Sequence, residues 1–417
     1  MIAEFTVENV LSFKDRRTFS LISAKDKELS DSNTFEADKK LRFLRSAVIY
    51  GANASGKSNF FNALVSFLRF AVFSGPHKQV EDPIEIEPFT FSKQTEAMPS
   101  FFEIVFFIKD GDETIRYRYG LLVSKKHVEA EYLFAVNNVR EIMLFERKFQ
   151  VINCTANFKE GARLKSSVRN NSSFLSVCAQ NNGEVSIQII KYFRNMRVLY
   201  GTSNAPIIFK KEELLPEQKK KTLDFLKYAD IQITDFKTER ITFSDDAPDA
   251  KTQTNIQHHN ILFGHTFFDE ETPVGEKFLE WIHESSGTLR LLSYSNDILS
   301  ALKEGTPIFI DEFDALLHPL IIEGIVKLFN SSVTNPKNAQ LVISCHAVNI
   351  MNNKLLRRDQ IWFCEKDQYG ATDLYSLVEY KEPVRKDASY NKNYLHGKYG
   401  AIPYIDDILF QVELNRQ

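Results

Sequence analysis

The feature that most constrains this chain is the stretch Gly51-Ala52-Asn53-Ala54-Ser55-Gly56-Lys57-Ser58, which matches the pattern G-x-x-x-x-G-K-[ST]. An apolar run at 47–50 precedes it and an amphipathic segment at 60–68 follows it, so we expect a strand, a glycine-rich turn and a helix. In that context the turn's N–H groups and the positive end of the helix dipole surround a polyphosphate. A chance glycine-rich turn is the alternative, but the flanking pattern favours a nucleotide-binding loop.

The residues of this loop have separate expected roles. Gly51 and Gly56 let the backbone curl around the phosphates. Lys57 is expected to reach the β- and γ-phosphates, and the Ser58 hydroxyl to bind Mg²⁺. The predicted cofactors are therefore ATP and Mg²⁺. The other predicted ATP-binding residues are Asn53, Ala54, Ser55 and Asn59.

A second set of candidate residues ends a short apolar strand that we expect at 307–312. Its last two residues are adjacent carboxylates. Asp311 is expected to bind the metal ion, and Glu312 to polarise the attacking water as general base. Strand alternation would point the two side chains to opposite faces. Alone, an acidic pair after an apolar run is also common at a surface turn. Its position about 250 residues after a phosphate loop favours catalysis.

Two further motifs accompany the acidic pair. A strand expected at 341–345 ends in His346, which could hydrogen-bond a γ-phosphate and align water, or be purely structural. Ser285, Ser286, Gly287 and Thr288 open a helix expected at 289–303, and they offer a second anion cradle or an N-cap alone. Because the chain already has one phosphate loop, this cradle would serve a nucleotide held by another copy.

The remaining pattern indicates a mixed α/β chain with an insertion. With 417 residues, 43% hydrophobic and 26% charged, the chain suits two or three packed domains. We expect strands at 2–10, 17–22, 196–200 and 231–243, helices at 172–179, 184–195 and 212–228, and an exposed loop at 244–257. A β meander is expected at 99–150, with a hairpin turn at Asp110-Gly111, and Gly75-Pro76 is expected to break the helix after the phosphate loop. The expected domains are 1–125, an inserted module at 126–275, and 276–417.

Composition and charge exclude several classes of protein. No uncharged apolar run is long enough to span a membrane, and the first residues do not form a signal peptide. Four scattered cysteines indicate reduced thiols and a cytoplasmic protein. The formal net charge of −3 does not indicate DNA binding, which stays open only through a local basic patch. Lys219-Lys220-Lys221 is such a candidate or a solvated helix face, and His258, His259 and His265 lack partners at metal-ligand spacing.

In this order, the motifs resemble those of ABC-type ATPases, and of the RecF/SMC-like branch in particular. The opening "FTVENVLSFKD" is similar to the first strand and loop of that branch, where the loop lies near the nucleotide. Leu317 and His318 match the "E-x-x-LHP" form of the D-loop, which crosses the dimer interface in such proteins. The resemblance implies a P-loop NTPase fold of ABC type, with a mixed core sheet, an antiparallel β subdomain and an α+β insertion. It also implies paired heads, in which Ser286 and Gly287 of one copy face Lys57, Ser58, Asp311 and Glu312 of the other.

A narrower resemblance covers most of the chain. "PSFFEIVFF", "YRYGL", "ESSGTLRLL", "IDEFDALLHP", "RRDQIWFCEKD" and "YLHGKYGAIPYI" together are similar to stand-alone ATPases of bacterial anti-phage systems, of the RloA, AbiL and PARIS ATPase-subunit type. That resemblance implies a homo-oligomer that senses a phage trigger protein and controls a separate effector, either a toxin or a Toprim-type nuclease. A RecF-like repair ATPase and a nucleotide-gated scaffold are the rivals. Two departures are a Ser-Ser-Gly-Thr signature and a Q-loop glutamine that could be Gln79 or Gln94.

Overall fold

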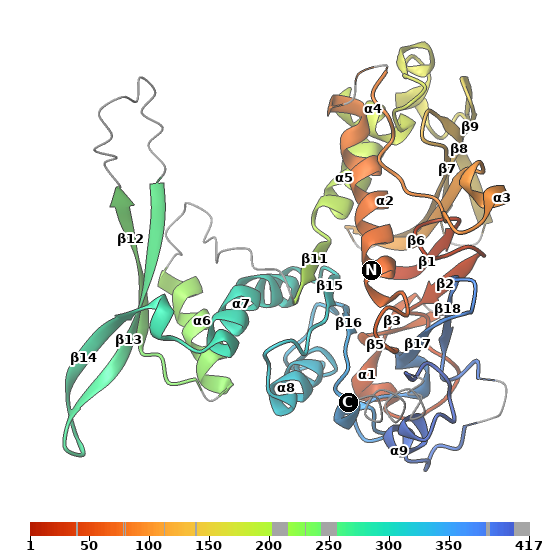
Figure 1. Ribbon diagram of the computed structural model, residues 1–417. Helices are drawn as coiled ribbons and strands as arrows, with labels where there is room; N and C mark the ends of the chain where they lie inside the picture. The colour runs from red at the N-terminus through yellow and green to blue at the C-terminus, as the bar shows by residue number, and fades with distance from the viewer. Residues whose placement is uncertain are drawn as a thin grey trace, which may run out of the picture.

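Two large sheets and the helices between them form a head, and a smaller sheet projects from its side (Figure 1). The computed structural model describes residues 1–38, 41–77, 79, 81–111, 113–137, 140–201, 216–229, 231–242, 257–380 and 384–403. Within this part of the chain, no helix combines the length and the apolar character needed to cross a bilayer.

The centre of the head is a six-stranded sheet in the order β11-β15-β16-β5-β17-β18. The first five strands are parallel, and β18 pairs antiparallel at the edge. Side chains of β5 alternate between the two hydrophobic cores, because Ala47 and Ile49 face one core and Val48 and Tyr50 the other. The strands are β5 (Ser46–Tyr50), β11 (Arg197–Tyr200), β15 (Ile308–Asp311), β16 (Leu341–Ser344), β17 (Ile361–Lys366) and β18 (Thr372–Ser376).

The second sheet has seven antiparallel strands in the order β10-β9-β8-β7-β6-β1-β2. The predicted meander and its hairpin at Asp110-Gly111 are confirmed, and Gly111 has a φ of 59° in the turn. The sheet continues across residue 125, where we expected a domain boundary. The strands are β1 (Ile2–Glu8), β2 (Arg17–Ser20), β6 (Ser100–Asp110), β7 (Glu113–Val123), β8 (Val128–Asn137), β9 (Arg140–Lys148) and β10 (Val151–Cys154).

Helix α2 (Lys57–His77) lies between the two large sheets, with α4 (Phe174–Gln180) and α5 (Glu184–Arg194) beside it (Figure 1). The expected break at Gly75-Pro76 is wrong, because α2 continues to His77 with Pro76 inside its last turn. A proline deprives the carbonyl four residues earlier of its helical partner. Here that carbonyl belongs to Val72, and it accepts a hydrogen bond of 3.1 Å from the Ser176 hydroxyl of α4.

The opposite face of the parallel sheet is covered by α7 (Ser286–Glu304) and α8 (Pro319–Phe329), and α9 (Tyr390–Leu395) and α6 (Pro216–Tyr228) join the same core. The predicted helices at 172–179, 184–195 and 289–303 are confirmed as α4, α5 and α7. Residues 212–215 of another predicted helix lie outside the described residues, and the rest forms α6.

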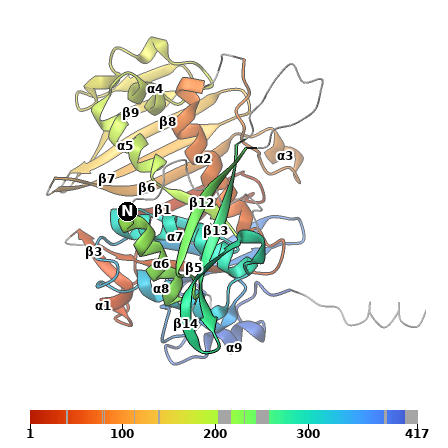
Figure 2. The same cartoon turned by 90° about the vertical axis from the view of Figure 1, so that its left-hand side faces the viewer.

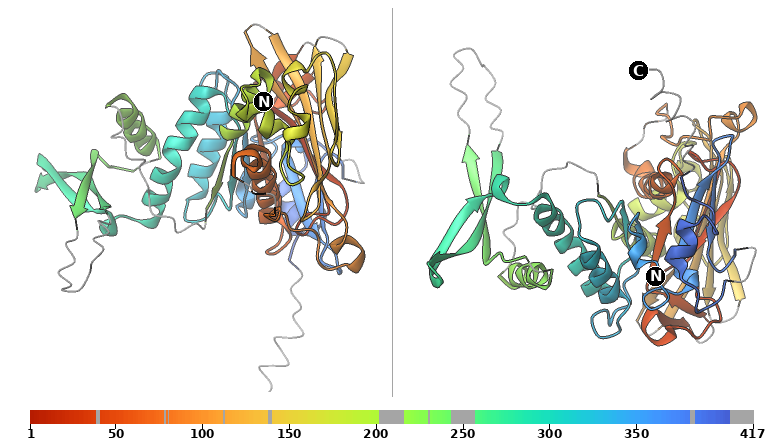
Figure 3. Two further views of the ribbon diagram at one scale, coloured as in Figure 1. Left: turned by 90° about the horizontal axis from the view of Figure 1, so that it is seen from above. Right: turned by 60° about the horizontal axis from the view of Figure 1, so that its bottom comes forward.

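A three-stranded antiparallel sheet, which we call the arm, projects away from the head (Figure 3) and points toward the viewer in Figure 2. It consists of β12 (Asp235–Thr242), β13 (Gln257–Asp269) and β14 (Thr272–Glu280), in that order. Phe236, Ile261 and Phe263 bury the base of the arm in the core that also contains α7. The exposed loop predicted at 244–257 lies outside the described residues except for Gln257.

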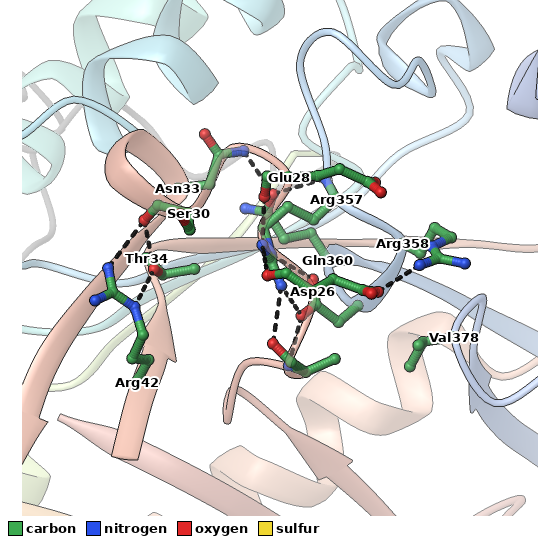
Figure 4. A network of polar contacts seen from close by, with 12 residues as sticks. Asp26, Glu28, Ser30, Asn33, Thr34, Arg42, Arg357, Arg358, Gln360 and Val378 are labelled. Atoms are coloured by element: carbon green, nitrogen blue, oxygen red, sulfur yellow. Dashed lines mark hydrogen bonds and ion pairs between the residues drawn. The ribbon is translucent and has the colours of Figure 1, made fainter. Parts of the chain in front are cut away.

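A buried polar network ties the chain after β2 to the base of the parallel sheet (Figure 4). Arg357 is 2% exposed, pairs with Asp359 at 2.7 Å and donates hydrogen bonds to three carbonyls of the 24–28 segment. Gln360 donates to the carbonyl of Ser46, the first residue of β5, at 2.9 Å. The smaller elements nearby are α1 (Ser30–Asn33), β3 (Thr34–Asp38) and β4 (Leu41–Leu44), and α3 (Lys93–Glu96) precedes β6.

Candidate functional site: a phosphate-binding loop at the edge of the parallel sheet

The glycine-rich stretch forms the turn between β5 and α2, as the sequence predicts. A Cβ atom at Gly51 would lie 2.4 Å from the carbonyl oxygen of Cys364, so that position has no room for a side chain. Gly56 has a φ of 109°, and its Cβ would lie 2.1 Å from Thr372 Oγ1. Both glycines are therefore required for the loop to pass close to β17 and β18.

Lys57 is the first residue of α2, and its side chain folds back into the loop. Its Nζ donates hydrogen bonds to the carbonyl oxygens of Gly51 at 2.8 Å and Ala52 at 2.9 Å, and the residue is 5% exposed. Burial lowers the pKa of Lys57, while the carboxylates of Asp311 and Glu312 act in the opposite direction. The ammonium group therefore lies inside the cradle, within electrostatic reach of the acidic pair.

A hydroxyl network joins the loop to two distant segments. Thr372 Oγ1 donates to the Ser55 carbonyl at 2.9 Å and lies 2.8 Å from the Ser12 hydroxyl, to which the Asn59 amide also donates at 2.8 Å. The loop after β1 is therefore joined to the phosphate-binding loop through Thr372 and to the first turn of α2 through Asn59. Sequence reasoning missed Thr372, because no local motif marks a threonine more than 300 residues away.

Asp311 ends β15 as predicted, but Glu312 lies outside the strand. Asp311 is 3% exposed, and its Oδ1 accepts a hydrogen bond of 2.5 Å from the Ser344 hydroxyl. Glu312 has a φ of 49°, in the left-handed region, so the strand ends one residue earlier than expected. The prediction that alternation separates the two carboxylates is therefore wrong, because alternation stops at Asp311.

His346 follows β16, the strand that lies between β5 and β15. Its backbone N–H donates to Asp314 Oδ2 at 2.8 Å. Burial and then the positive charge of Lys57 lower the pKa of His346, against the opposing effect of the nearby carboxylates. The imidazole is therefore neutral at pH 7 and can act as a hydrogen-bond donor through one nitrogen.

The Ser-Ser-Gly-Thr motif opens α7, which packs on the other face of the sheet from α2. Ser285 is the N-cap, and its hydroxyl accepts a hydrogen bond of 3.0 Å from the Thr288 N–H. Ser286, the first residue of α7, is exposed. A Cβ at Gly287 would lie 2.8 Å from the Leu316 carbonyl, so the motif lies against the turn that follows Glu312.

The D-loop residues occupy that same turn. Leu317 is buried, and His318 is the N-cap of α8, where its Nδ1 accepts a hydrogen bond of 3.2 Å from the Leu320 N–H. Because β5, β15 and β16 are parallel, their carboxyl ends bring the loop, Asp311 and His346 to one edge of the sheet. The Ser-Ser-Gly-Thr motif meets the same edge from the opposite face.

Residues 46–352 match the family described as "AAA domain, putative AbiEii toxin, Type IV TA system". This match spans the loop, the acidic pair and His346. The chain belongs to this family. Among curated proteins, none matches the sequence.

Similar solved structures include an SMC head domain from Thermotoga maritima, with 12% identity over 90% of this chain and 98% of the other and a TM-score of 0.41. Another is CbiO1 from Clostridium perfringens, part of the ABC transporter complex CbiONQ, with 10% identity, coverage of 96% and 93%, and a TM-score of 0.33. A third is the recombination mediator RecF with ATP, with 12% identity, coverage of 90% and 97%, and a TM-score of 0.30.

The predicted fold class of this AAA-domain protein is confirmed. The family match covers its P-loop, and the structure has the expected mixed core sheet and antiparallel β subdomain. One strand, β16, separates the strand that precedes the P-loop from the strand that carries Asp311. In this AAA-domain protein, the P-loop, Asp311 and His346 therefore lie at or just after the ends of strands, and the Ser-Ser-Gly-Thr motif lies at the start of a helix.

The site has the donors that a magnesium–nucleotide complex needs. The two glycines leave a cradle that a side chain would fill, and the buried Ser55 hydroxyl beside Gly51 finds no hydrogen-bond partner among the residues that the structure describes. Ser58 and Asp311 supply hydroxyl and carboxylate oxygens, which are the ligands that Mg²⁺ prefers. The residues of this AAA-domain protein therefore fit ATP and Mg²⁺.

Gln79 does not lie at the nucleotide site of the AAA-domain protein. It follows the far end of α2, about 30 Å along the helix from Lys57 at 1.5 Å per residue. Gln94 lies on the exposed side of α3. Gly201, which follows β11, does lie at the edge of the sheet that carries Asp311, because its N–H donates to the Asp311 carbonyl at 2.7 Å.

The lysine cluster and His265, two other features noted in the sequence, contact nearby carboxylates. Lys219 pairs with Asp235 at 2.5 Å and Lys221 with Glu217 at 2.8 Å, so this lysine cluster of the AAA-domain protein is largely neutralised. His265 Nε2 lies 2.6 Å from Glu284 Oε1 and joins β13 to the residue before the N-cap of α7. The side chains of His258 and His259 lie outside the described residues.

Proposed function

We propose that this AAA-domain protein binds and hydrolyses ATP in a composite site made by two copies of the chain. One copy supplies the P-loop, Asp311, Glu312 and His346, and the other supplies Ser286 and Gly287. The observation that carries the proposal is the placement of Ser286, which is exposed beside the turn after Glu312 and on the face of the sheet opposite to α2. A helix start in that position offers its N–H groups outward, to a phosphate held by a facing copy.

Each residue then has a defined task. The Lys57 ammonium neutralises the β- and γ-phosphates, and Glu312 accepts the proton of the attacking water. His346, being neutral, donates a hydrogen bond to the γ-phosphate and orients that water. When bound by Ser58 and Asp311, Mg²⁺ would neutralise phosphate charge.

We further propose that the nucleotide state controls a separate toxin or Toprim-type nuclease in cytoplasmic anti-phage defence, in response to a phage trigger protein. The connections of the arm support this regulatory role. Gly201 is the last described residue before α6 and the arm, and its N–H donates to the Asp311 carbonyl. Glu284 follows the arm, contacts His265 and precedes the N-cap Ser285. The described residues on both sides of α6 and the arm therefore contact elements of the proposed nucleotide site. We propose that the arm and α6 receive the partner.

A complementation experiment tests the composite site. Ser286→Arg should block the partner's nucleotide, and Lys57→Ala should abolish ATP binding on its own chain, so neither variant alone should turn over ATP. Mixed pairs contain one intact site, which combines the P-loop of the Ser286→Arg chain with the helix start of the Lys57→Ala chain. A 1:1 mixture should therefore regain about one quarter of wild-type turnover, because half of the pairs are mixed in an isologous dimer.

The control is Ser166→Arg, which adds the same charge at an exposed position of the antiparallel subdomain. It should turn over ATP as wild type does. Full activity of Ser286→Arg alone would show that the site is completed within one chain. No recovery in the mixture, although both variants are folded and associate, would also reject the composite site.

The partner is tested separately in cells. The native locus should reduce phage plaque formation, and the Lys57→Ala variant should lose that protection. A repair role would instead show as salt-dependent binding of duplex DNA by the isolated protein, without an effect on plaques. That outcome would replace the defence assignment but leave the ATP site intact.

A further inference from the structure

The backbone of Glu312 adopts a conformation that a non-glycine residue rarely adopts. Its φ of 49° lies in the left-handed region, where the Cβ atom crowds the backbone. Such a residue relaxes to an ordinary conformation unless its surroundings hold it. The position of the proposed general base therefore depends on the residues that contact its backbone.

One neighbour is Ser344, the last residue of β16. Its hydroxyl accepts the Glu312 N–H at 2.7 Å and donates to Asp311 Oδ1 at 2.5 Å, and the residue is fully buried. Its carbonyl oxygen also accepts the Phe313 N–H at 3.0 Å. A single serine therefore contacts both members of the acidic pair and the residue that follows them.

The other neighbour is Gly201, at the end of β11 on the far side of β15. Its N–H donates to the Asp311 carbonyl, and a Cβ atom at this position would lie 2.0 Å from the Glu312 carbonyl oxygen. Because Gly201 has no side chain, the Glu312 carbonyl oxygen can occupy this space in the left-handed turn. Ser344 therefore holds the Glu312 N–H from one side, and Gly201 leaves room for the Glu312 carbonyl on the other.

We propose that Ser344 is a positioning residue for ATP hydrolysis, which fixes Glu312 in its left-handed conformation and orients the Asp311 carboxylate. The inference rests on the proposed role of Glu312 as general base. Without the hydroxyl, the Glu312 N–H loses its acceptor and the buried Asp311 carboxylate loses a donor. The turn then relaxes, and the carboxylate of Glu312 leaves the position from which it accepts a proton.

The test compares Ser344→Ala with Ser344→Thr, which keeps the hydroxyl. In Ser344→Ala we expect kcat to fall about tenfold or more, a part of what a general base contributes, while ATP affinity stays within about threefold. Ser344→Thr should keep most of the turnover. The matched control is Ser186→Ala, because Ser186 is also fully buried and its hydroxyl also donates to a carboxylate, that of Glu160, far from the site. It should lower the melting temperature to a similar extent without lowering kcat.

A double-mutant cycle separates positioning from general damage. If Ser344 acts through Glu312, then Ser344→Ala should cost little further turnover in a Glu312→Gln background. Gly201→Ala, which presses on the same turn from β11, should lower kcat in the same way. Wild-type kcat in Ser344→Ala, or full additivity with Glu312→Gln, would overturn the inference. Turnover of Glu312→Gln equal to that of wild type would instead reject the general base itself and with it the proposed function.

Discussion

A methyl group added at Gly56 gives a sharp test of the phosphate-binding loop. In Gly56→Ala the new Cβ would lie 2.1 Å from Thr372 Oγ1 and 2.7 Å from Thr372 Cγ2, far inside contact distance. Thr372 is the first residue of β18, which β17 separates from β5, and its hydroxyl also contacts Ser55 and Ser12. The loop and β18 therefore cannot both keep their places.

The size of the effect follows from three costs. Displacing Thr372 breaks its contacts with the Ser55 carbonyl and the Ser12 hydroxyl, each worth about 1 kcal/mol. Alanine at a φ of 109° adds about 1–2 kcal/mol of backbone strain. Together these terms reach about 3–4 kcal/mol against the loop conformation, which corresponds to about a hundredfold loss of ATP affinity or more.

The assay is a titration with a fluorescent ATP analogue, accompanied by thermal unfolding. The control is Gly111→Ala, because Gly111 also has a positive φ, of 59°, but no atom of the other described residues apart from its chain neighbours lies within 4 Å of its Cβ position. This control shares the backbone strain and should bind ATP normally. Adding Thr372→Ala to Gly56→Ala removes the Oγ1 and Cγ2 atoms and should restore part of the affinity. An affinity of Gly56→Ala within about threefold of wild type would show that ATP does not bind the loop in this conformation.

Three further predictions test His346, the arm and the buried network. Burial and then Lys57 lower the pKa of His346, so the loss of kcat caused by its protonation should begin at a more acidic pH than for an ordinary histidine, and this loss should be missing from the pH profile of His346→Gln. His265→Ala breaks the contact with Glu284 and should change kcat a few-fold at unchanged ATP affinity, whereas Lys277→Ala, directly across the strand pair, should not. Arg357→Ala leaves the buried Asp359 carboxylate unpaired, and urea unfolding should show a loss of about 3–5 kcal/mol.

The parts of the site that depend on local pattern could be predicted from the sequence. The P-loop, Asp311 at a strand end and Ser285 at a helix start each combine a residue type with an adjacent strand or helix, and the structure has all three. The hairpin at Asp110-Gly111 is of the same kind. In each case neighbours in the chain determine the conformation, so a short window of sequence contains the signal.

The parts that depend on distant contacts could not be predicted. The Ser12 and Thr372 hydroxyls meet the P-loop only through the fold, and neither stands in a motif of its own. Pro76 fits within α2 because Ser176, a hundred residues later, satisfies the carbonyl that the proline frees. Glu312 turns left-handed because Ser344 and Gly201 hold it from two other strands.

The antiparallel sheet continues across residue 125, where we expected a domain boundary, and this continuity also depends on distant contacts that the local sequence does not show. Alternating apolar residues indicate that a segment is a strand, but they do not indicate which sheet it joins. β8 pairs with β7 and extends the antiparallel sheet, while β11, from the same expected insertion, pairs with β15 in the parallel sheet. Among the described residues, the strands of the expected insertion that join neither large sheet are those of the arm.

That placement has a thermodynamic consequence for regulation. Gly201 contacts the strand that carries Asp311, and Glu284 joins the arm to the helix start that we assign to the partner's nucleotide, so a ligand of the arm and ATP act on the same elements. A partner protein can change ATP affinity only by the ratio of its own affinities for the two nucleotide states. By reciprocity, ATP must then change the affinity of that partner by the same factor. Measuring the partner's Kd with and without a non-hydrolysable ATP analogue, and the analogue's Kd with and without the partner, should give equal ratios different from one. A ratio of one in both directions would show that the arm does not transmit the nucleotide state.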